Sequence, residues 1–485
     1  MNSGLIKSRL VPLFCKKNKP MATIKFGTDG WRAIIAKDYT VDNVKRITQA
    51  TATFMLKNDM EKVVIGFDCR FGGAMFAEVA TQVFGANGIK VNLAKIPVST
   101  PMVSLGVVKT KSDLGVVITA SHNPPSYNGF KLKSAYGGPT IPADITAVEE
   151  EIPDEVTVAL PSLEKMHDAG LLSYIELEDM YVEHVKANFD LDLINNSGIK
   201  VAYDAMYGAG QDAVKRILTN TVLLHCEHNP SFYGQAPEPI HRNLTELSET
   251  IKNDATIACG LANDGDADRI GMYDEDGNFV DSHRILLLLL VYLHKYKKLT
   301  GKVILTFSVT EKLQNLCKQF GLEYEVTKIG FKYIAEIMTK EDVLLGGEES
   351  GGIAAKGHIP ERDGIWMGLL ILEFMANTGK SLKELIAEVY SYVGAFSYDR
   401  DDLHINDQLK KDIISKCKED PYTEFGQYKV KDLQTIDGFK YIFSDDEWVM
   451  IRPSGTEPVL RVYAQAPTAA GVRKILDAAH ATLLG

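Results

Sequence analysis

Residues 113–133, DLGVVITASHNPPSYNGFKLK, contain the feature that decides the fold. The apolar run from Leu114 to Ile118 predicts a buried strand, which stops just before Ser121 and His122. The following pair, Pro124-Pro125, lacks backbone donors and forces the chain out of the sheet. In open α/β sheets, ligands bind at the carboxyl ends of strands, so we expect the Ser121 hydroxyl to be exposed there on a stiff loop.

The chain then returns toward the same sheet. Asn128-Gly129 is a strong turn dipeptide, and Phe130 and Leu132 alternate with Lys131 and Lys133 beyond it. Because side chains alternate along a strand, the two ammonium groups share one face. Cations near the serine suit an anionic reactant. The structural alternative is a serine in a turn or cap and two lysines on a solvated edge.

Composition describes an ordinary globular protein. The 485 residues are 45% hydrophobic and 24% charged, enough for three or four domains of about 100 to 200 residues each. The net charge of −11 disfavours a nucleic-acid surface. The six cysteines show no Cys-x-x-Cys spacing, which indicates neither zinc nor disulfides and fits a reducing, cytoplasmic compartment. The longest apolar run, Ile285 to Leu293, is about half of a membrane span and predicts a buried helix.

A strand, helix, strand order occurs three times, at 63–91, 199–226 and 302–327. We therefore predict an α/β protein of three similar tandem α/β domains with mixed sheets, followed by a C-terminal α+β domain, with the active site in the central cleft. The predicted domains are residues 21–172, 173–280, 281–394 and 395–485, after a disordered N-terminal extension at residues 1–20.

Three acidic residues alternate in what the sequence predicts to be an extended segment, Asp264, Asp266 and Asp268. Their carboxylates can converge on one hard cation, for which Mg²⁺ is the natural choice. An EF-hand competes, because Glu275 is twelfth counted from Asp264. Against it, Arg269 stands where that loop needs glycine, and the flanks IACGLA and IGMY predict strands rather than helices.

Two further loops are suited to binding a sugar phosphate. The glycine-rich loop 347–352 carries Glu348 and Ser350, which can hydrogen-bond sugar hydroxyls in pairs. Residues 452–458, RPSGTEP, lie between two predicted strands and offer hydroxyls, N–H groups and a guanidinium to a phosphate dianion. Arg461 can add a second guanidinium that donates two hydrogen bonds. A plain hairpin turn is the alternative for this second loop.

Together the strings TASHNPP, DGDADR, GEESGG and RPSGTEP resemble the four signature loops of the α-D-phosphohexomutase superfamily of phosphoglucomutase, phosphomannomutase and phosphoglucosamine mutase. The resemblance implies that Ser121 carries a phosphoryl group and, as phosphoserine, completes the metal site of the three aspartates. It also implies that Glu348 and Ser350 read the hydroxyls at carbons 3 and 4. The other implied substrate-binding residues are Thr327, Lys328, Gly330, Arg452, Ser454, Gly455, Thr456 and Arg461.

By the same resemblance, phospho-Ser121 phosphorylates a hexose 1- or 6-phosphate, with glucose the expected sugar. The resulting glucose 1,6-bisphosphate, an intermediate and activator, turns over and returns its other phosphate. The implied catalytic set is Ser121, His122, Lys131, His358 and Arg32, in which Lys131 or His358 handles the hydroxyl proton. Arg70, in a second loop of the first domain, is either functional or part of a salt bridge.

One position departs from the family pattern. Mannose- and glucosamine-directed enzymes usually place histidine directly after GExSG, where this chain has Gly352. Glucose-directed enzymes carry it in a segment resembling HIREKDG, which residues 358–364 match with one extra residue of spacing. His358 is therefore the predicted acid–base histidine, and a satisfied loop histidine is the alternative.

Other functions remain open on the sequence alone. They are a glucose-1,6-bisphosphate synthase, a phosphomannomutase or phosphoglucosamine mutase, a metal-dependent phosphatase with a serine nucleophile, and a non-catalytic sugar-phosphate-binding protein. The expected partners are hexose phosphates, without nucleic acid or membrane, and the expected state is a monomer or homodimer.

Overall fold

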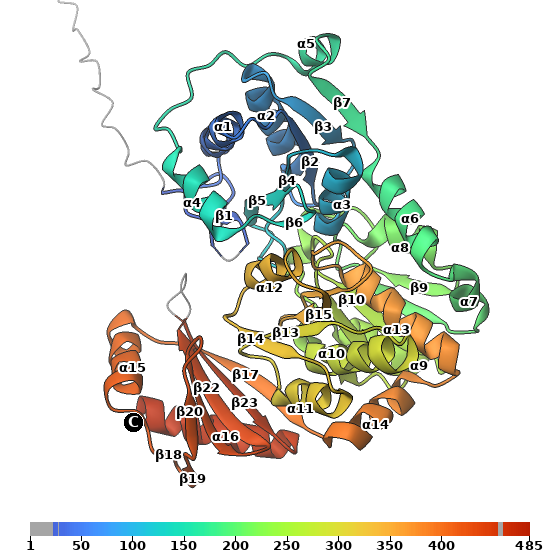
Figure 1. Cartoon of the computed structure of the whole chain (residues 1–485), viewed down its shortest axis with the longest axis vertical. Coiled ribbons are helices and arrows are strands. Elements are labelled where there is room, and N and C mark those ends of the chain that lie inside the picture. Colours follow the sequence, from blue (N-terminus) through green and yellow to red (C-terminus); the bar gives the residue numbers. More distant parts are fainter. Residues whose placement is uncertain (1–22, 28, 454–458) are drawn as a thin grey trace, which may run out of the picture.

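The computed structural model describes residues 23–27, 29–453 and 459–485, which form four successive sheet-based domains (Figure 1). The predicted extension at residues 1–20 lies outside the described residues. Among the described helices, none combines the length and the apolar character that crossing a bilayer requires. The predicted class, three mixed α/β domains and a final α+β domain, is confirmed.

Domain 1 is built on a seven-stranded sheet of order β1-β5-β4-β2-β3-β7, in which β6 pairs with β5. Its central strands pair in parallel, whereas β5 runs antiparallel to β4 and β1. The apolar residues alternate between two faces: Val116 and Ile118 pack toward α1 and α2, and Val117 packs toward α3. The elements are β1 Trp31–Ile34, α1 Val41–Lys57, β2 Lys62–Phe67, α2 Gly73–Ala86, β3 Lys90–Ala94, α3 Thr100–Thr110, β4 Leu114–Ile118, β5 Tyr127–Ser134, β6 Gly138–Pro139, α4 Pro142–Glu150, α5 Leu163–Asp168 and β7 Leu172–Ile175.

Two sequence expectations for domain 1 need correction. The sheet continues to Ile175, so a boundary at residue 172 would cut through its edge strand. Asn128 and Gly129 are not a turn but lie within β5, where Gly129 pairs with Arg32. The glycine is needed because a Cβ there would lie 2.4 Å from the Thr119 carbonyl oxygen.

Domain 2 has a five-stranded sheet of order β12-β11-β10-β8-β9. The predicted parallel strand, helix, strand unit is present as β8, α8 and β9. The hairpin of β10 and β11 follows, and its connecting loop carries the three aspartates. The elements are α6 Leu177–Asn188, α7 Leu191–Asn196, β8 Val201–Asp204, α8 Gln211–Ile217, β9 Thr221–Leu224, the 3₁₀ turns Phe232–Gly234 and His241–Asn243, α9 Thr245–Asn253, β10 Cys259–Asn263, β11 Ile270–Tyr273 and β12 Phe279–Val280.

Domain 3 has a four-stranded sheet of order β14-β13-β15-β16. Residues 285–293 of its first helix are buried and apolar, as predicted. This helix and α13 belong to one continuous core that also includes side chains of α3 and α6, so domains 1 to 3 are packed as one body. The elements are α10 Ser282–Leu290, continued by a π-helical turn Val291–Tyr296, β13 Lys302–Thr306, α11 Glu311–Phe320, β14 Tyr324–Thr327, α12 Phe331–Met338, β15 Val343–Gly347, β16 Ile353–Ala355, α13 Gly364–Thr378 and α14 Leu382–Val393.

Domain 4 has its own core and an antiparallel sheet of order β17-β23-β22-β21-β20. It lies beside domain 3 (Figure 1), and Phe307 of domain 3 packs against Trp448, Met450 and Tyr463. This contact is far smaller than the core shared by the other domains, which makes domain 4 the part best suited to move. The elements are β17 Ser397–His404, α15 Asp407–Glu419, β18 Glu424–Phe425, β19 Tyr428–Lys429, β20 Asp432–Gln434, β21 Phe439–Ser444, β22 Glu447–Pro453, β23 Val459–Ala466 and α16 Ala469–Leu484.

Candidate active site

Ser121 follows β4 in a left-handed backbone conformation, with φ of 52°. This conformation costs a non-glycine residue about 1–3 kcal/mol and must be held by its surroundings. Arg70 supplies the support: its guanidinium donates to the backbone carbonyls of Ser121, Asn123, Pro124 and Tyr127. Arg70 is thus a buried clamp on the serine loop, which the sequence alone had left undecided.

The Ser121 hydroxyl faces both a carboxylate and an imidazole. Oγ donates to Asp264 Oδ2 at 2.7 Å and lies 3.3 Å from His122 Nδ1. Burial and the nearby positive charges of Arg269 and Arg32 hold the pKa of His122 well below its usual range, so its ring is neutral. Arg32 donates to the Asn123 side chain at 2.8 Å, which places it beside the serine loop.

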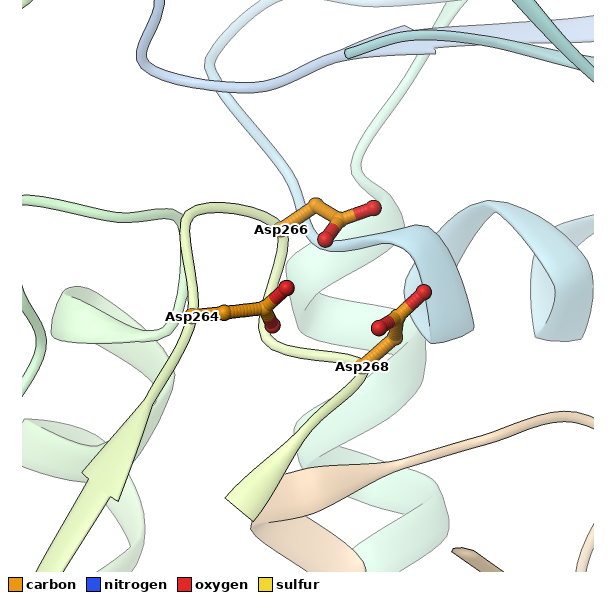
Figure 2. Close-up of side chains that lie close together, drawn as sticks. All are labelled: Asp264, Asp266 and Asp268. Carbon is orange, nitrogen blue, oxygen red and sulfur yellow. The ribbon is translucent and has the colours of Figure 1, made fainter. Parts of the chain in front are cut away.

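Asp264, Asp266 and Asp268 lie close together on the loop between β10 and β11 (Figure 2). The loop contains a turn, with Ala267 at φ of 55°, and is not the extended segment that the alternation predicted. Because the flanking elements are strands, an EF-hand is excluded. The loop packs on the serine loop, since a Cβ at Gly265 would lie 2.6 Å from the Ser121 carbonyl oxygen.

The trio fits a hard cation. Each aspartate is buried, and a set of ligand oxygens, one from each residue, lies within 4.8 Å of one another. Asp266 Oδ1 and Asp268 Oδ1 are buried without a hydrogen-bond partner, which is costly unless a ligand binds there. Burial and its two acidic neighbours raise the pKa of Asp264 well above its usual range. Oxygen-only donors of this kind suit Mg²⁺.

Lys131, on β5, is completely buried against acidic groups. Its Nζ lies 2.7 Å from Asp266 Oδ2, 3.0 Å from Asp268 Oδ2 and 2.8 Å from Asp29 Oδ2. Burial acts to lower the pKa of Lys131, but the three carboxylates raise it above its usual range. The ammonium therefore stays charged in this arrangement.

Arg362 is a site residue that the sequence reasoning missed. It precedes α13, lies 2.7 Å from Asp268 Oδ2, and also pairs with Asp29, thereby joining three domains. Gly352 makes room for it, since a Cβ at that position would lie 2.5 Å from Arg362 Cδ. The signal for it was the match of residues 358–364 to the HIREKDG segment, which also covers position 362.

The loop carrying Glu348 and Ser350 borders the metal loop. Ile270 N–H donates to the Gly351 carbonyl at 3.2 Å, and Arg269 forms a β-bridge with Gly352. Burial raises the pKa of Glu348 to about 7, although Arg362 lies 3.8 Å away. Ser350 is partly exposed. The two predicted sugar-reading residues thus lie next to the aspartate trio.

His358, the predicted acid–base histidine, lies in a stacked and buried position. Its ring is stacked on Trp366 with centroids 3.9 Å apart, and its side chain is fully buried. Nε2 pairs with Asp363 at 2.9 Å and Nδ1 lies 3.3 Å from His184. Both ring nitrogens are therefore engaged away from Ser121, as in the satisfied loop histidine that was the alternative.

The predicted phosphate loop lies on domain 4. Arg452 and Arg461 are directly opposite each other on β22 and β23, and each pairs with a carboxylate, Arg452 with Asp437 at 3.2 Å and Arg461 with Asp402 at 3.9 Å. Nε of each is buried without a hydrogen-bond partner. Ser454, Gly455 and Thr456 lie outside the described residues.

The companion loop of domain 3 approaches this pair. Asp437 accepts from Arg452 Nη2 at 3.2 Å and from the Ile329 N–H at 2.9 Å, so the loop of Thr327, Lys328 and Gly330 lies near Arg452. Within the described part of the chain, no hydrogen bond or ion pair joins Arg452 or Arg461 to Ser121 or the aspartates. The structure thus brings the serine, metal and sugar loops together, and among the described residues no hydrogen bond or ion pair links the arginine pair to the serine or metal loop.

Comparison with known proteins accounts for nearly the whole chain. Models of the phosphoglucomutase/phosphomannomutase family match as α/β/α domain I at residues 23–158, domain II at 179–277, domain III at 281–392 and the C-terminal domain at 406–481.

Individual relatives agree with these models. A probable phosphoglucosamine mutase of Methanosphaera stadtmanae is 32% identical over 91% of this chain and 94% of its own length. A phosphoglucomutase/phosphomannomutase of Thermococcus kodakarensis is 30% identical over 93% and 96%. The crystal structure of a putative phosphomannomutase from Thermus thermophilus superposes with a TM-score of 0.85 at 33% identity, covering 96% of this chain and 100% of that one. The chain is therefore an enzyme of the phosphoglucomutase/phosphomannomutase family of phosphohexomutases.

Proposed function

We propose that this phosphohexomutase interconverts glucose 1-phosphate and glucose 6-phosphate through phospho-Ser121, with glucose 1,6-bisphosphate as the intermediate. The observation that carries the proposal is the Ser121 Oγ, 2.7 Å from Asp264 Oδ2, on a loop held by Arg70. A reactive hydroxyl beside a cation site is what phosphoryl transfer requires of a protein, since its catalysis rests on positioning and charge neutralisation.

Asp264, Asp266 and Asp268 would hold Mg²⁺, and the phosphoserine would complete its ligands. When bound, the cation would neutralise charge on the transferring phosphoryl group. The chain's own residues position the reactants around it. Arg362 and Lys131 add positive charge beside the trio, and Glu348 and Ser350 would bind the sugar hydroxyls.

In the forward half-reaction, the sugar hydroxyl bonds to phosphorus and loses its proton, while the bond between Ser121 Oγ and phosphorus breaks and Oγ takes up a proton. In the return half, Ser121 Oγ bonds to the other phosphorus of the bisphosphate and loses its proton, while the bond between that phosphorus and the sugar oxygen breaks and the sugar oxygen takes up a proton. His122 is the group we propose for that proton, because its neutral Nδ1 lies 3.3 Å from Oγ. His358 is not proposed for this role, given its stacked position.

Between the halves, the bisphosphate must turn while one phosphate stays bound. Arg452 and Arg461, with Ser454, Gly455 and Thr456, would hold the phosphate that is not reacting. Thr327, Lys328 and Gly330 would contact the substrate beside them. Since domain 4 has only a small contact with domain 3, its closure would bring Arg452 toward the serine.

The proposal of glucose rests on Gly352, which stands at the position where the mannose and glucosamine pattern has a histidine, and where a side chain would meet Arg362. Relatives named as phosphoglucosamine mutases make that amino sugar the principal alternative. A coupled assay with Mg²⁺ and a trace of glucose 1,6-bisphosphate should give the highest kcat/KM for glucose 1-phosphate, compared with the mannose and glucosamine 1-phosphates. A higher value for either competitor would refute the glucose assignment.

Replacement of the serine tests the mechanism separately from the sugar. Ser121→Ala should abolish turnover of all three substrates. Activity at the wild-type level in that variant would refute the phosphoserine mechanism. In the wild-type assay, accumulation of the bisphosphate in place of the isomerised monophosphate would instead identify a synthase. Release of inorganic phosphate would identify a phosphatase.

A further inference from the structure

The two oxygens of Asp266 and of Asp268 have different surroundings. On both residues, Oδ2 receives hydrogen bonds or ion pairs from buried side chains. On both residues, Oδ1 is buried and has no hydrogen-bond partner. The protein therefore uses one oxygen of each carboxylate itself and leaves the other for a ligand.

The groups on the Oδ2 side come from different parts of the fold. Lys131 Nζ reaches both atoms, at 2.7 Å from Asp266 Oδ2 and 3.0 Å from Asp268 Oδ2. Thr100 Oγ donates to Asp266 Oδ2, and Arg362 Nη2 lies 2.7 Å from Asp268 Oδ2. All three side chains are buried, so water does not compete for these contacts.

Lys131 is itself held in place. Its third contact, at 2.8 Å, is with Asp29 Oδ2, and Asp29 also pairs with Arg362. An ammonium held by three carboxylates in a buried position has little freedom to leave them. Its position therefore fixes the orientation of both carboxylate planes.

We propose that Lys131 is the residue that sets the cation preference of this site, because it restricts Asp266 and Asp268 to one ligand oxygen each. Mg²⁺ needs near-ideal octahedral coordination by few carboxylate oxygens, whereas Ca²⁺ takes six to eight oxygens and often binds carboxylates through both. Because the Oδ2 atoms of Asp266 and Asp268 already have partners in the protein, Ca²⁺ cannot bind either carboxylate through both oxygens. The inference deepens the proposed function, since it rests on the trio being the metal site, and it makes Lys131 a positioning residue.

The test compares cation binding in the whole purified chain, without substrate. Isothermal titration with MgCl₂ and with CaCl₂ gives the ratio of the two dissociation constants for wild type, Lys131→Met and Lys133→Met. Lys133 is the matched control: it is buried on the same face of β5 and pairs with Glu361 at 2.7 Å and with Asp29 at 3.6 Å, but not with the trio. The phosphorylation state of Ser121 is matched between samples by intact mass.

We expect wild type and Lys133→Met to prefer Mg²⁺, and Lys131→Met to lose about tenfold or more of that preference through tighter Ca²⁺ binding. Thr100→Val, which frees part of Asp266 Oδ2, should shift the ratio in the same direction by a smaller factor. This second variant decides the matter if Lys131→Met does not fold.

Two results would overturn the inference. One is a ratio of Mg²⁺ to Ca²⁺ dissociation constants that is the same in folded Lys131→Met as in wild type. If Lys131→Met does not fold, the same result in Thr100→Val would overturn it. The other is an equal shift in Lys133→Met. These results differ from those expected if the trio is not the metal site. In that case wild type would bind neither cation, or Asp266→Asn would leave Mg²⁺ binding unchanged.

Discussion

Removal of the Arg70 guanidinium tests how the protein holds its serine loop. In Arg70→Met, the carbonyls of Ser121, Asn123, Pro124 and Tyr127 lose their donor. At a net value of about 1 kcal/mol for each bond, the free energy of unfolding should fall by roughly 4 kcal/mol. Because the left-handed conformation of Ser121 depends on these bonds, turnover should fall by about a hundredfold or more.

The loss of unfolding free energy in Arg70→Met should also depend on pH, because Arg70 lies beside the buried carboxyl group of Asp68. Burial raises the pKa of Asp68 to about 6, while Arg70 acts to lower it. A carboxyl whose folded-state pKa is raised stabilises the fold at low pH, and that contribution is lost as pH rises through the folded pKa. Without Arg70 the pKa of Asp68 rises further, so the contribution of Asp68 to the unfolding free energy continues to fall above pH 6. The difference between variant and wild type should therefore be larger at pH 8 than at pH 6.

The assay is urea unfolding followed by circular dichroism at both pH values, together with the coupled activity measurement. Arg46→Met is the matched control, because Arg46 is a buried arginine on α1 that donates to the Pro153 carbonyl, outside the serine loop. It should retain activity. Arg70→Met with full turnover, or with a stability loss that is no larger than the control's and does not change with pH, would refute the reasoning.

Three further substitutions probe other contacts. Because burial raises the pKa of Glu348 to about 7, the unfolding free energy of wild type falls as pH rises toward 8. In urea unfolding, the unfolding free energy of Glu348→Gln should therefore rise relative to that of wild type by roughly 2 kcal/mol between pH 5 and pH 8. A difference that stays constant with pH would contradict this. Gly352→Ala, whose Cβ would lie 2.5 Å from Arg362 Cδ, should lower the unfolding free energy by about 1–3 kcal/mol and also lower kcat/KM; unchanged values would mean that Arg362 can move aside. His358→Gln should cost about 1–2 kcal/mol and keep kcat within about twofold, whereas a large loss of kcat at normal stability would restore the acid–base role.

Local sequence signals predicted the parts of the site that depend on neighbouring residues. The apolar run and the prolines located Ser121 at the end of β4, and the strand-like flanks of DGDADR excluded an EF-hand. These features follow from side-chain alternation and backbone chemistry, which act over a few residues. The arrangement of three α/β units was predictable for the same reason.

Contacts between domains were not predictable in this way. Arg362 reaches Asp29 and Asp268 across more than one domain boundary, and its own segment does not reveal these partners. His358 matched a family motif, but its stack on Trp366 depends on α13 and α6 packing together. Gly129 looked like a turn residue, whereas its small size serves the close approach of the Thr119 backbone. Each of these arrangements depends on tertiary packing, which a local pattern does not determine.

The most direct test of the central claim is peptide mass spectrometry of the protein before and after reaction with hexose monophosphate. After treatment with glucose 1,6-bisphosphate that carries an isotopic label in its phosphates, labelled phosphate should be found on Ser121. When excess unlabelled glucose 1-phosphate is added, the label should pass to the sugar phosphate at a rate no slower than turnover, while Ser121 is phosphorylated again by unlabelled phosphate. Phosphate on another residue, or a label that stays on Ser121 while the enzyme turns over, would contradict the account.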